Sequence, residues 1–149
     1  MSIVFKNKTP IIVSSTICLF FKKIFGFSVG AVALSPFIIV RDTKILNTPE
    51  YITHECIHIR QYIETLIVGI LIIGFIQYLY ARIILKKSRT QAYYFMSHEQ
   101  EAHQNDENPD YLKLRKWFSY YKYLNPKNKI RMDLVNGKRI KLTSPSPTL

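Results

Sequence analysis

The chain is poor in several residue types, and each deficit excludes a class of protein. Two cysteines, Cys18 and Cys56, among 149 residues cannot form the disulfide framework of a small secreted domain. The five glycines form no loop that could cradle a phosphate, and no segment repeats another. We therefore expect neither a disulfide scaffold, a P-loop domain nor a repeat array, and we expect any functional site to work in a reducing, cytoplasmic environment.

Acidic residues are also scarce, since ten Asp and Glu stand against 21 Lys and Arg, for a net charge of +11. The imbalance is strongest from Lys113 to Lys141, where Asp133 is the only acid. Such a basic segment suits phospholipid headgroups or nucleic acid, although scattered charges more often form a solvated face. The aromatic residues of this segment have helical spacing, which favours packing over base stacking. An anionic membrane surface is therefore the partner that we expect, rather than nucleic acid.

No apolar run reaches the length of about eighteen residues that marks a clean transmembrane helix. Three shorter runs are present, Ile11–Phe21, Ile24–Val40 and Leu66–Ala81. The third run could be extended to a span from Ile63 to Leu85, and 29–40 could form a strand and turn or a re-entrant segment. Three such runs in so short a chain predict membrane association, with ordinary core helices as the alternative.

The motif HExxH is present once, at residues 54–58. Residues four apart lie above one another on a helix, so His54 and His58 can bind one Zn²⁺ from a single turn. Glu55 between them can act as the general base that takes a proton from water. This string predicts metal binding more strongly than it predicts catalysis, because catalysis also needs a third ligand and an open position.

The residues around the motif predict the helix that it needs. Thr48 is suited to the N-cap, Pro49 to the first helical position and Glu50 to the first turn. Gln61 and Thr65 continue the polar stripe of the two histidines, so Gln61 is a candidate to support a ligand or to contact substrate. A polar stripe on an otherwise apolar helix favours a buried site.

A second helix is predicted from Arg89 to Asn105, and it offers the third ligand. It carries four candidates: His98, Glu99, Glu101 and His103.

Further along, Asn108-Pro109-Asp110 starts a new helix, amphipathic from Leu114 to Tyr121 and ended by Asn125-Pro126. A β-hairpin is predicted over Lys129–Leu142 with an Asn136-Gly137 turn, followed by a disordered tail at 143–149.

HExxH with a later ExEA resembles the gluzincin metallopeptidases, in the style of membrane-embedded peptidases of the CAAX-prenyl-protease and HtpX type, whose second motif is ExxA(D). That resemblance implies that Glu99 is the third ligand and that Ala102 matches the alanine. His103 stands where those families have Asp, which leaves Glu101 and His103 as alternative ligands.

The chain is more closely similar to small bacterial HExxH proteins of unassigned function, which are grouped with the peptidases on their motif alone. This resemblance covers about Ile24 to Leu124 and implies a zinc site without naming a substrate. The residues that carry it are Ser35-Pro36-Phe37-Ile38, the HExIHxxQ string from His54 to Gln61, Glu99-Gln100-Glu101-Ala102 with Asn105, Tyr111-Leu112 and Arg115.

Glu99 can reach His58 only if the chain between them turns back. A straight helix from His58 to Leu85 would run about 40 Å, and a return helix to Glu99 only about 21 Å. Unpaired backbone is not tolerated in lipid, so extended chain cannot fill the difference there. We therefore predict that the motif helix ends or bends between Gly69 and Gly74.

The sequence thus predicts a mainly α fold with minor β: a zincin-like helical core, N-terminal apolar segments and a C-terminal hairpin, in one membrane-associated domain over residues 1–142. We expect a zinc-dependent metallopeptidase at a membrane, acting on a peptide or protein substrate, with the site on the cytoplasmic side of the inner membrane. His54, His58 and Glu99 would bind Zn²⁺, and Glu55 would be the base. The alternative is an inactive zinc-binding membrane adaptor that uses its basic C-terminal surface.

Overall fold

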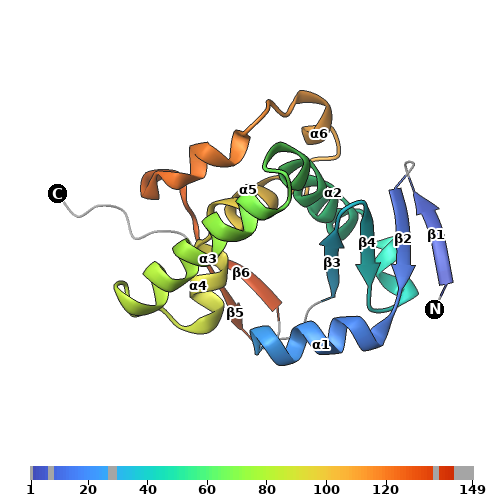
Figure 1. Cartoon of the computed structure of the whole chain (residues 1–149), viewed down its shortest axis with the longest axis horizontal. Coiled ribbons are helices and arrows are strands. Elements are labelled where there is room, and N and C mark those ends of the chain that lie inside the picture. Colours follow the sequence, from blue (N-terminus) through green and yellow to red (C-terminus); the bar gives the residue numbers. More distant parts are fainter. Residues whose placement is uncertain (1, 7–8, 27–29, 136–137, 143–149) are drawn as a thin grey trace.

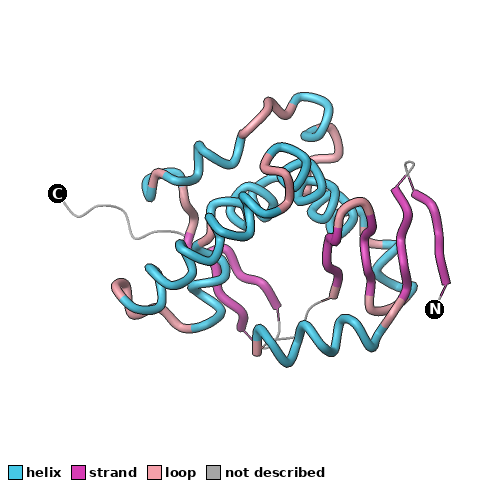
Figure 2. The backbone as a smooth tube through the Cα atoms, viewed as in Figure 1, coloured by secondary structure: helices cyan, strands magenta, loops and turns pink. Residues whose placement is uncertain are grey.

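The computed structural model describes residues 2–6, 9–26, 30–135 and 138–142. The strands of the main sheet lie at one side of the molecule and most of the helices at the other, with the C-terminal hairpin behind the helices (Figures 1 and 2). The predicted class, mainly α with minor β, is confirmed. The first forty residues contribute more of the β structure than the hairpin does, because they supply all four strands of the main sheet.

The main sheet has the strand order β1-β2-β4-β3. Strands β1 and β2 are antiparallel, β2 and β4 are parallel, and β4 and β3 are antiparallel, so β3 is an outer strand. Helix α1 (Ser15–Phe25), capped by the Ser14 hydroxyl, follows β2 and runs below the ends of β4 and β3 in the view of Figure 1. The bounds are β1 Ser2–Lys6, β2 Thr9–Val13, β3 Ala31–Leu34 and β4 Phe37–Val40.

The apolar core lies between this sheet and the helix that carries HExxH. Ile11, Ile38 and Val40 from the sheet are fully buried against Ile45 of the 3-10 helix η1 (Thr43–Asn47) and against Ile52. Helix α2 (Pro49–Glu64) begins where the sequence predicted, after an extended Thr48. Packing of α2 on the sheet leaves its polar stripe facing the other helices.

A sharp bend follows the motif helix, at 65–67, and the two helix axes there differ by 110°. The Thr65 hydroxyl donates a hydrogen bond to the Gln61 carbonyl, and Leu66 and Ile67 have φ of 52° and 66°. Positive φ is strained for a β-branched residue such as Ile67. The chain therefore turns at a site that no glycine or proline marks.

The predicted break between Gly69 and Gly74 is thus wrong in position, although the turn itself is present. Helix α3 (Val68–Ile83) continues through both glycines. Gly74 is instead a packing residue, because a Cβ there would come within 2.5 Å of His98 Cε1. No single described helix is both long and apolar enough to cross a membrane, and only α2 and α3 taken together meet that test by length and composition.

The predicted helix from Arg89 to Asn105 is two helices, α4 (Arg89–Phe95) and α5 (Ser97–Asn105). Ser88 caps α4 with a capping box, as its position suggested, but Met96 is extended. The Gln77 side chain of α3 accepts a hydrogen bond from the Ser97 amide and donates one to the Ser97 hydroxyl. The Gln77 side chain thus supplies the acceptor that the first backbone amide of α5 lacks, so the chain can leave the helical conformation at Met96.

The predicted amphipathic helix after Pro109 is also wrong. The chain forms α6 (Tyr111–Leu114), an extended Arg115 and two 3-10 segments, η2 (Ser119–Leu124) and η3 (Pro126–Asn128). Arg115 leaves the helical conformation and pairs with two buried carboxylates, described below. The predicted hairpin is confirmed as β5 (Arg131–Val135) and β6 (Lys138–Leu142), while its turn and the tail at 143–149 lie outside the described residues.

Candidate metal centre

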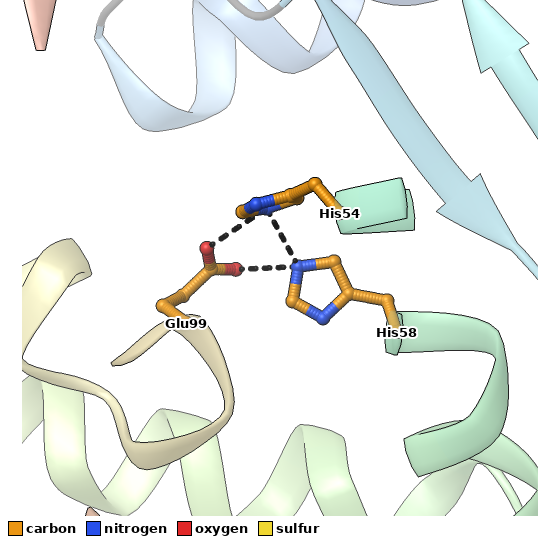
Figure 3. A group of neighbouring side chains, drawn as sticks. All are labelled: His54, His58 and Glu99. Carbon is orange, nitrogen blue, oxygen red and sulfur yellow. Dashed lines mark hydrogen bonds and ion pairs between the residues drawn. The ribbon is translucent and has the colours of Figure 1, made fainter. Parts of the chain in front are cut away.

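Three side chains that the sequence proposed as ligands converge between α2 and α5. His54 Nε2 lies 3.1 Å from His58 Nε2 and 3.6 Å from Glu99 Oε2, and His58 Nε2 lies 3.4 Å from Glu99 Oε1. Figure 3 shows both rings and the carboxylate pointing toward one another. All three side chains are buried. Residues forty-one positions apart in sequence, His58 and Glu99, are therefore brought together by the fold.

The spacing suits a metal ion of zinc's size. Zinc bonds of about 2.0–2.2 Å at tetrahedral angles place ligand atoms roughly 3.3–3.6 Å apart, close to the distances found. Two imidazole nitrogens 3.1 Å apart must share a proton or a cation between them. Glu99 Oε2 is buried, and imidazole nitrogens of His54 and His103 lie 3.6 and 3.4 Å from it. A buried lone pair of this kind is available to a metal ion.

Gln61 holds His58 in one tautomer. The Gln61 amide nitrogen donates to Glu101 Oε2 at 2.8 Å and to the His98 carbonyl at 3.2 Å. Its oxygen therefore faces His58 Nδ1, at 2.7 Å, and must accept a hydrogen from it. The lone pair of His58 is then on Nε2, which faces the site.

Asp106 orients the His54 ring from its Nδ1 side, and the sequence analysis did not predict this residue. Its Oδ2 lies 3.4 Å from His54 Nδ1 and 3.5 Å from His103 Nδ1. His103 Nε2 in turn lies 3.4 Å from Glu99 Oε2. Glu99, His103 and Asp106 follow one another at i, i+4 and i+7, which is one helix face, and this spacing is the signal that could have found Asp106.

The charges of the cluster support one another. Burial lowers the pKa of His54, but hydrogen bonds to Asp106 and Glu99 outweigh it and raise the value to about 10. Burial would raise the pKa of Glu99, yet the charge of His58 and hydrogen bonds from both histidines hold it well below its usual range. Burial lowers the pKa of His98 to about 4, so this residue is neutral at pH 7. The site thus keeps a carboxylate ionised in a buried position, which suits a cation.

Glu55 lies beside this cluster, at the floor of a cavity of about 530 Å³. Its carboxylate accepts a hydrogen bond from the Ala33 amide of β3, and burial raises its pKa. The cavity has a polar floor from α2 and α5 and largely apolar walls from β3 and α3. Its lining includes Ala31, Val32, Ala33, Leu34, Glu55, His58, Gln61, Tyr62, Ile70, Leu71, Gly74, Phe75, Tyr78, Tyr93, Met96, His98 and Glu99.

The two tyrosines that precede the ligand helix differ in position. Tyr93 lines the cavity and donates a hydrogen bond to Glu99, and burial together with that carboxylate raises its pKa well above 10. The ring of Tyr94 packs on His103 at 5.0 Å. Of the pair, Tyr93 is the one whose hydroxyl reaches the site.

Glu101 is turned away from the convergent ligands and belongs to a second buried cluster. Its oxygens accept hydrogen bonds from Tyr111 at 2.8 Å and from Arg115 Nε at 2.6 Å, as well as from Gln61. Arg115 also forms two hydrogen bonds with Glu64, and all three ionised side chains are at least 96% buried. Glu101 therefore supports His58 through Gln61 and does not stand among the possible ligands.

No protein-family model, curated protein or solved structure matches the chain.

Proposed function

We propose that the protein is a zinc-dependent metallopeptidase. The observation that carries this proposal is the convergence of His54, His58 and Glu99, of which His58 and Glu99 line the same cavity as Glu55. Three protein ligands, two imidazoles and one carboxylate, are typical of catalytic zinc sites that keep an open position, and four closed ligands are typical of structural sites. The resemblance to gluzincins and to small bacterial HExxH proteins belongs to the same proposal.

The donor atoms favour Zn²⁺ over harder cations. Imidazole nitrogen suits zinc and other late first-row metals, whereas Ca²⁺ and Mg²⁺ prefer sites built from oxygen alone. When bound at three protein ligands, Zn²⁺ polarises a carbonyl group and lowers the pKa of water to about 7. Asp106 and Gln61 keep the two histidines oriented for it.

Glu55 is the general base in this proposal. It takes the proton of the attacking water and delivers it to the leaving amine. Burial raises its pKa, which makes the carboxylate a stronger base toward water and lets it hold the proton until the leaving amine accepts it. The Ala33 amide orients the carboxylate by donating a hydrogen bond to it.

The cavity also suits an extended peptide. Strand β3 is the outer strand of the sheet and lines the cavity over its whole length. Its other edge pairs with β4, so its free edge can accept a peptide strand by backbone hydrogen bonds. The apolar walls favour apolar side chains in that peptide.

The experiment that tests the proposal separates binding from chemistry. Purified protein is assayed for zinc content and for cleavage of a mixture of quenched fluorescent peptides with apolar residues. Glu55→Gln should retain about one zinc per chain and lose at least about 100-fold in rate, while His58→Ala should lose both. Glu107→Gln, an exposed acid next to Asp106, is the matched control and should change neither.

Two outcomes would contradict the proposal that the protein is a zinc metallopeptidase. Unchanged zinc content in His58→Ala would mean that the metal is elsewhere. A wild-type protein that holds zinc tightly but cleaves no peptide would support the non-catalytic adaptor instead.

A further inference from the structure

One face of α3 is apolar and exposed along its whole length. Six residues at helical spacing form this surface, the α3 ridge, and most are more than half exposed. The ridge consists of Val68, Ile72, Phe75, Ile76, Leu79 and Ile83. Exposed apolar surface of this extent on a folded protein marks a contact with a partner.

The opposite face of α3 is fixed to the protein, so the ridge cannot turn inward. Ile70, Gly74 and Ala81 are buried. Gln77 on the same face makes hydrogen bonds of 2.6 and 3.0 Å to Ser97 at the start of α5. The exposure of the ridge is therefore a consequence of how the helix is anchored.

The charges around the ridge indicate what covers it. The sequence has no acid between Glu64 and Glu99, whereas four cations lie at the carboxyl end of α3 and just beyond it: Arg82, Lys86, Lys87 and Arg89. The Arg89 side chain lies against Gly26, the C-cap of α1, whose last turn adds Lys22 and Lys23. An apolar helix face with a basic border is complementary to a bilayer with anionic headgroups.

We propose that the α3 ridge seats the protein on an anionic lipid bilayer, with α3 lying in the plane of the interface. Sixteen helical residues extend about 24 Å, which is short of the roughly 30 Å hydrocarbon thickness. Helix α2, at 110° to it, carries the buried histidines and carboxylates of the metal centre and packs within the protein. An in-plane position buries the ridge without moving either helix.

This position places the cavity beside the lipid surface. Leu71, Phe75 and Tyr78 line the cavity and belong to the same helix as the ridge. Apolar segments at the bilayer surface would thus lie next to the cavity's apolar wall. The bilayer contact itself does not depend on the proposed peptidase activity.

Flotation of the full chain with lipid vesicles tests this inference. Vesicles of phosphatidylcholine with about one third phosphatidylglycerol should carry the protein upward, and vesicles of phosphatidylcholine alone should carry at least tenfold less. Ile76→Glu should lower the partition to anionic vesicles at least tenfold, because it places a charge in the ridge. Leu114→Glu adds the same charge at an exposed apolar residue of α6 and should leave the partition unchanged.

Zinc content and circular dichroism of Ile76→Glu show whether the variant is folded, since Ile76 does not line the cavity. Equal partition of Ile76→Glu and wild type would overturn the ridge as the contact. Equal partition to both kinds of vesicle would overturn the role of the basic border. Self-association that Ile76→Glu abolishes, without any vesicle binding by the wild type, would assign the ridge to a second copy of the chain and overturn the inference.

Discussion

The helical half of the molecule has two regions of opposite character. Between α2 and α5, ionisable side chains are buried and nearly all are held by hydrogen bonds or ion pairs. On the outer face of α3, apolar side chains are exposed and no acid is present. Both regions go against the usual distribution, in which polar groups lie outside and apolar groups inside. The first region could hold a cation, and we propose that the second contacts a lipid bilayer.

The largest effect is expected where the first region is most buried. Arg115→Met leaves Glu64 and Glu101 without their shared cation, so we expect a loss of about 3–5 kcal/mol in the free energy of unfolding. Denaturant unfolding measures it. Lys113→Met, which breaks an ion pair whose partners are 78% and 61% exposed, should leave the free energy of unfolding almost unchanged. Equal losses in the two variants would show that the buried cluster is dispensable.

The link from that cluster to the metal centre can be tested through Gln61. Gln61→Met removes the acceptor of His58 Nδ1, and we expect zinc affinity to fall about 10–100-fold. Competition with a chelator measures it. Gln104→Met is the matched control, because Gln104 lies on α5 and its side-chain hydrogen bonds within the described part of the chain go to Gln100 and the Asn128 carbonyl. An unchanged zinc affinity in Gln61→Met would show that the hydrogen bond to His58 Nδ1 does not influence zinc binding.

The boundary between the two regions is the contact of Gly74 with His98. Gly74→Ala should lower the free energy of unfolding by about 1–3 kcal/mol, because the new Cβ would lie 2.5 Å from a buried ring, although alanine is the better helix former. Gly69→Ala meets only the Thr65 side chain at 3.0 Å and should cost less. Thermal unfolding of both variants compares them, and a more stable Gly74→Ala would mean that α3 is loosely seated.

The pH dependence of zinc binding tests the charges of the first region. Because the pKa of metal-free His54 is raised to about 10, zinc must displace its proton at every pH below that value. Apparent zinc affinity should therefore fall about tenfold for each pH unit of acidification, measured by calorimetry at about pH 6, 7 and 8. Asp106→Asn removes a cause of the raised pKa and should flatten this slope near pH 8. A flat profile in the wild type would show that His54 is already neutral.

The smallest effect is expected on the second region. Ile76→Ser on the α3 ridge should change the free energy of unfolding by less than about 0.5 kcal/mol, because Ile76 is 61% exposed. Ile70→Ser on the opposite face, at 3% exposure, should cost at least about 2 kcal/mol. Similar losses at both positions would mean that the ridge is packed within the protein, which would end the contrast between the regions.

Local signals in the sequence account for the elements that depend on near neighbours. Thr48-Pro49 marked the start of α2, Ser88 the start of α4, and the alternation after Lys129 the hairpin. The spacing of His54 and His58 placed both on one helix face, and that face is buried as expected. These features follow from periodicity and capping, which act over a few residues.

Only the tertiary structure decided where the helices turn and what supports the ligands. No glycine or proline lies at the bend at 65–67, at the break at Met96 or at the extended Arg115. The break at Met96 coincides with hydrogen bonds to the distant Gln77 side chain, and the extended Arg115 pairs with the distant Glu64 side chain. Periodicity predicted continuous helices there, since it cannot see a distant partner that satisfies a helix end or a buried guanidinium. The sequence by itself therefore determined which residues could bind a metal. The folded chain decided that Glu99 stands beside His54 and His58, and that Asp106 orients His54, because those contacts join residues more than forty positions apart.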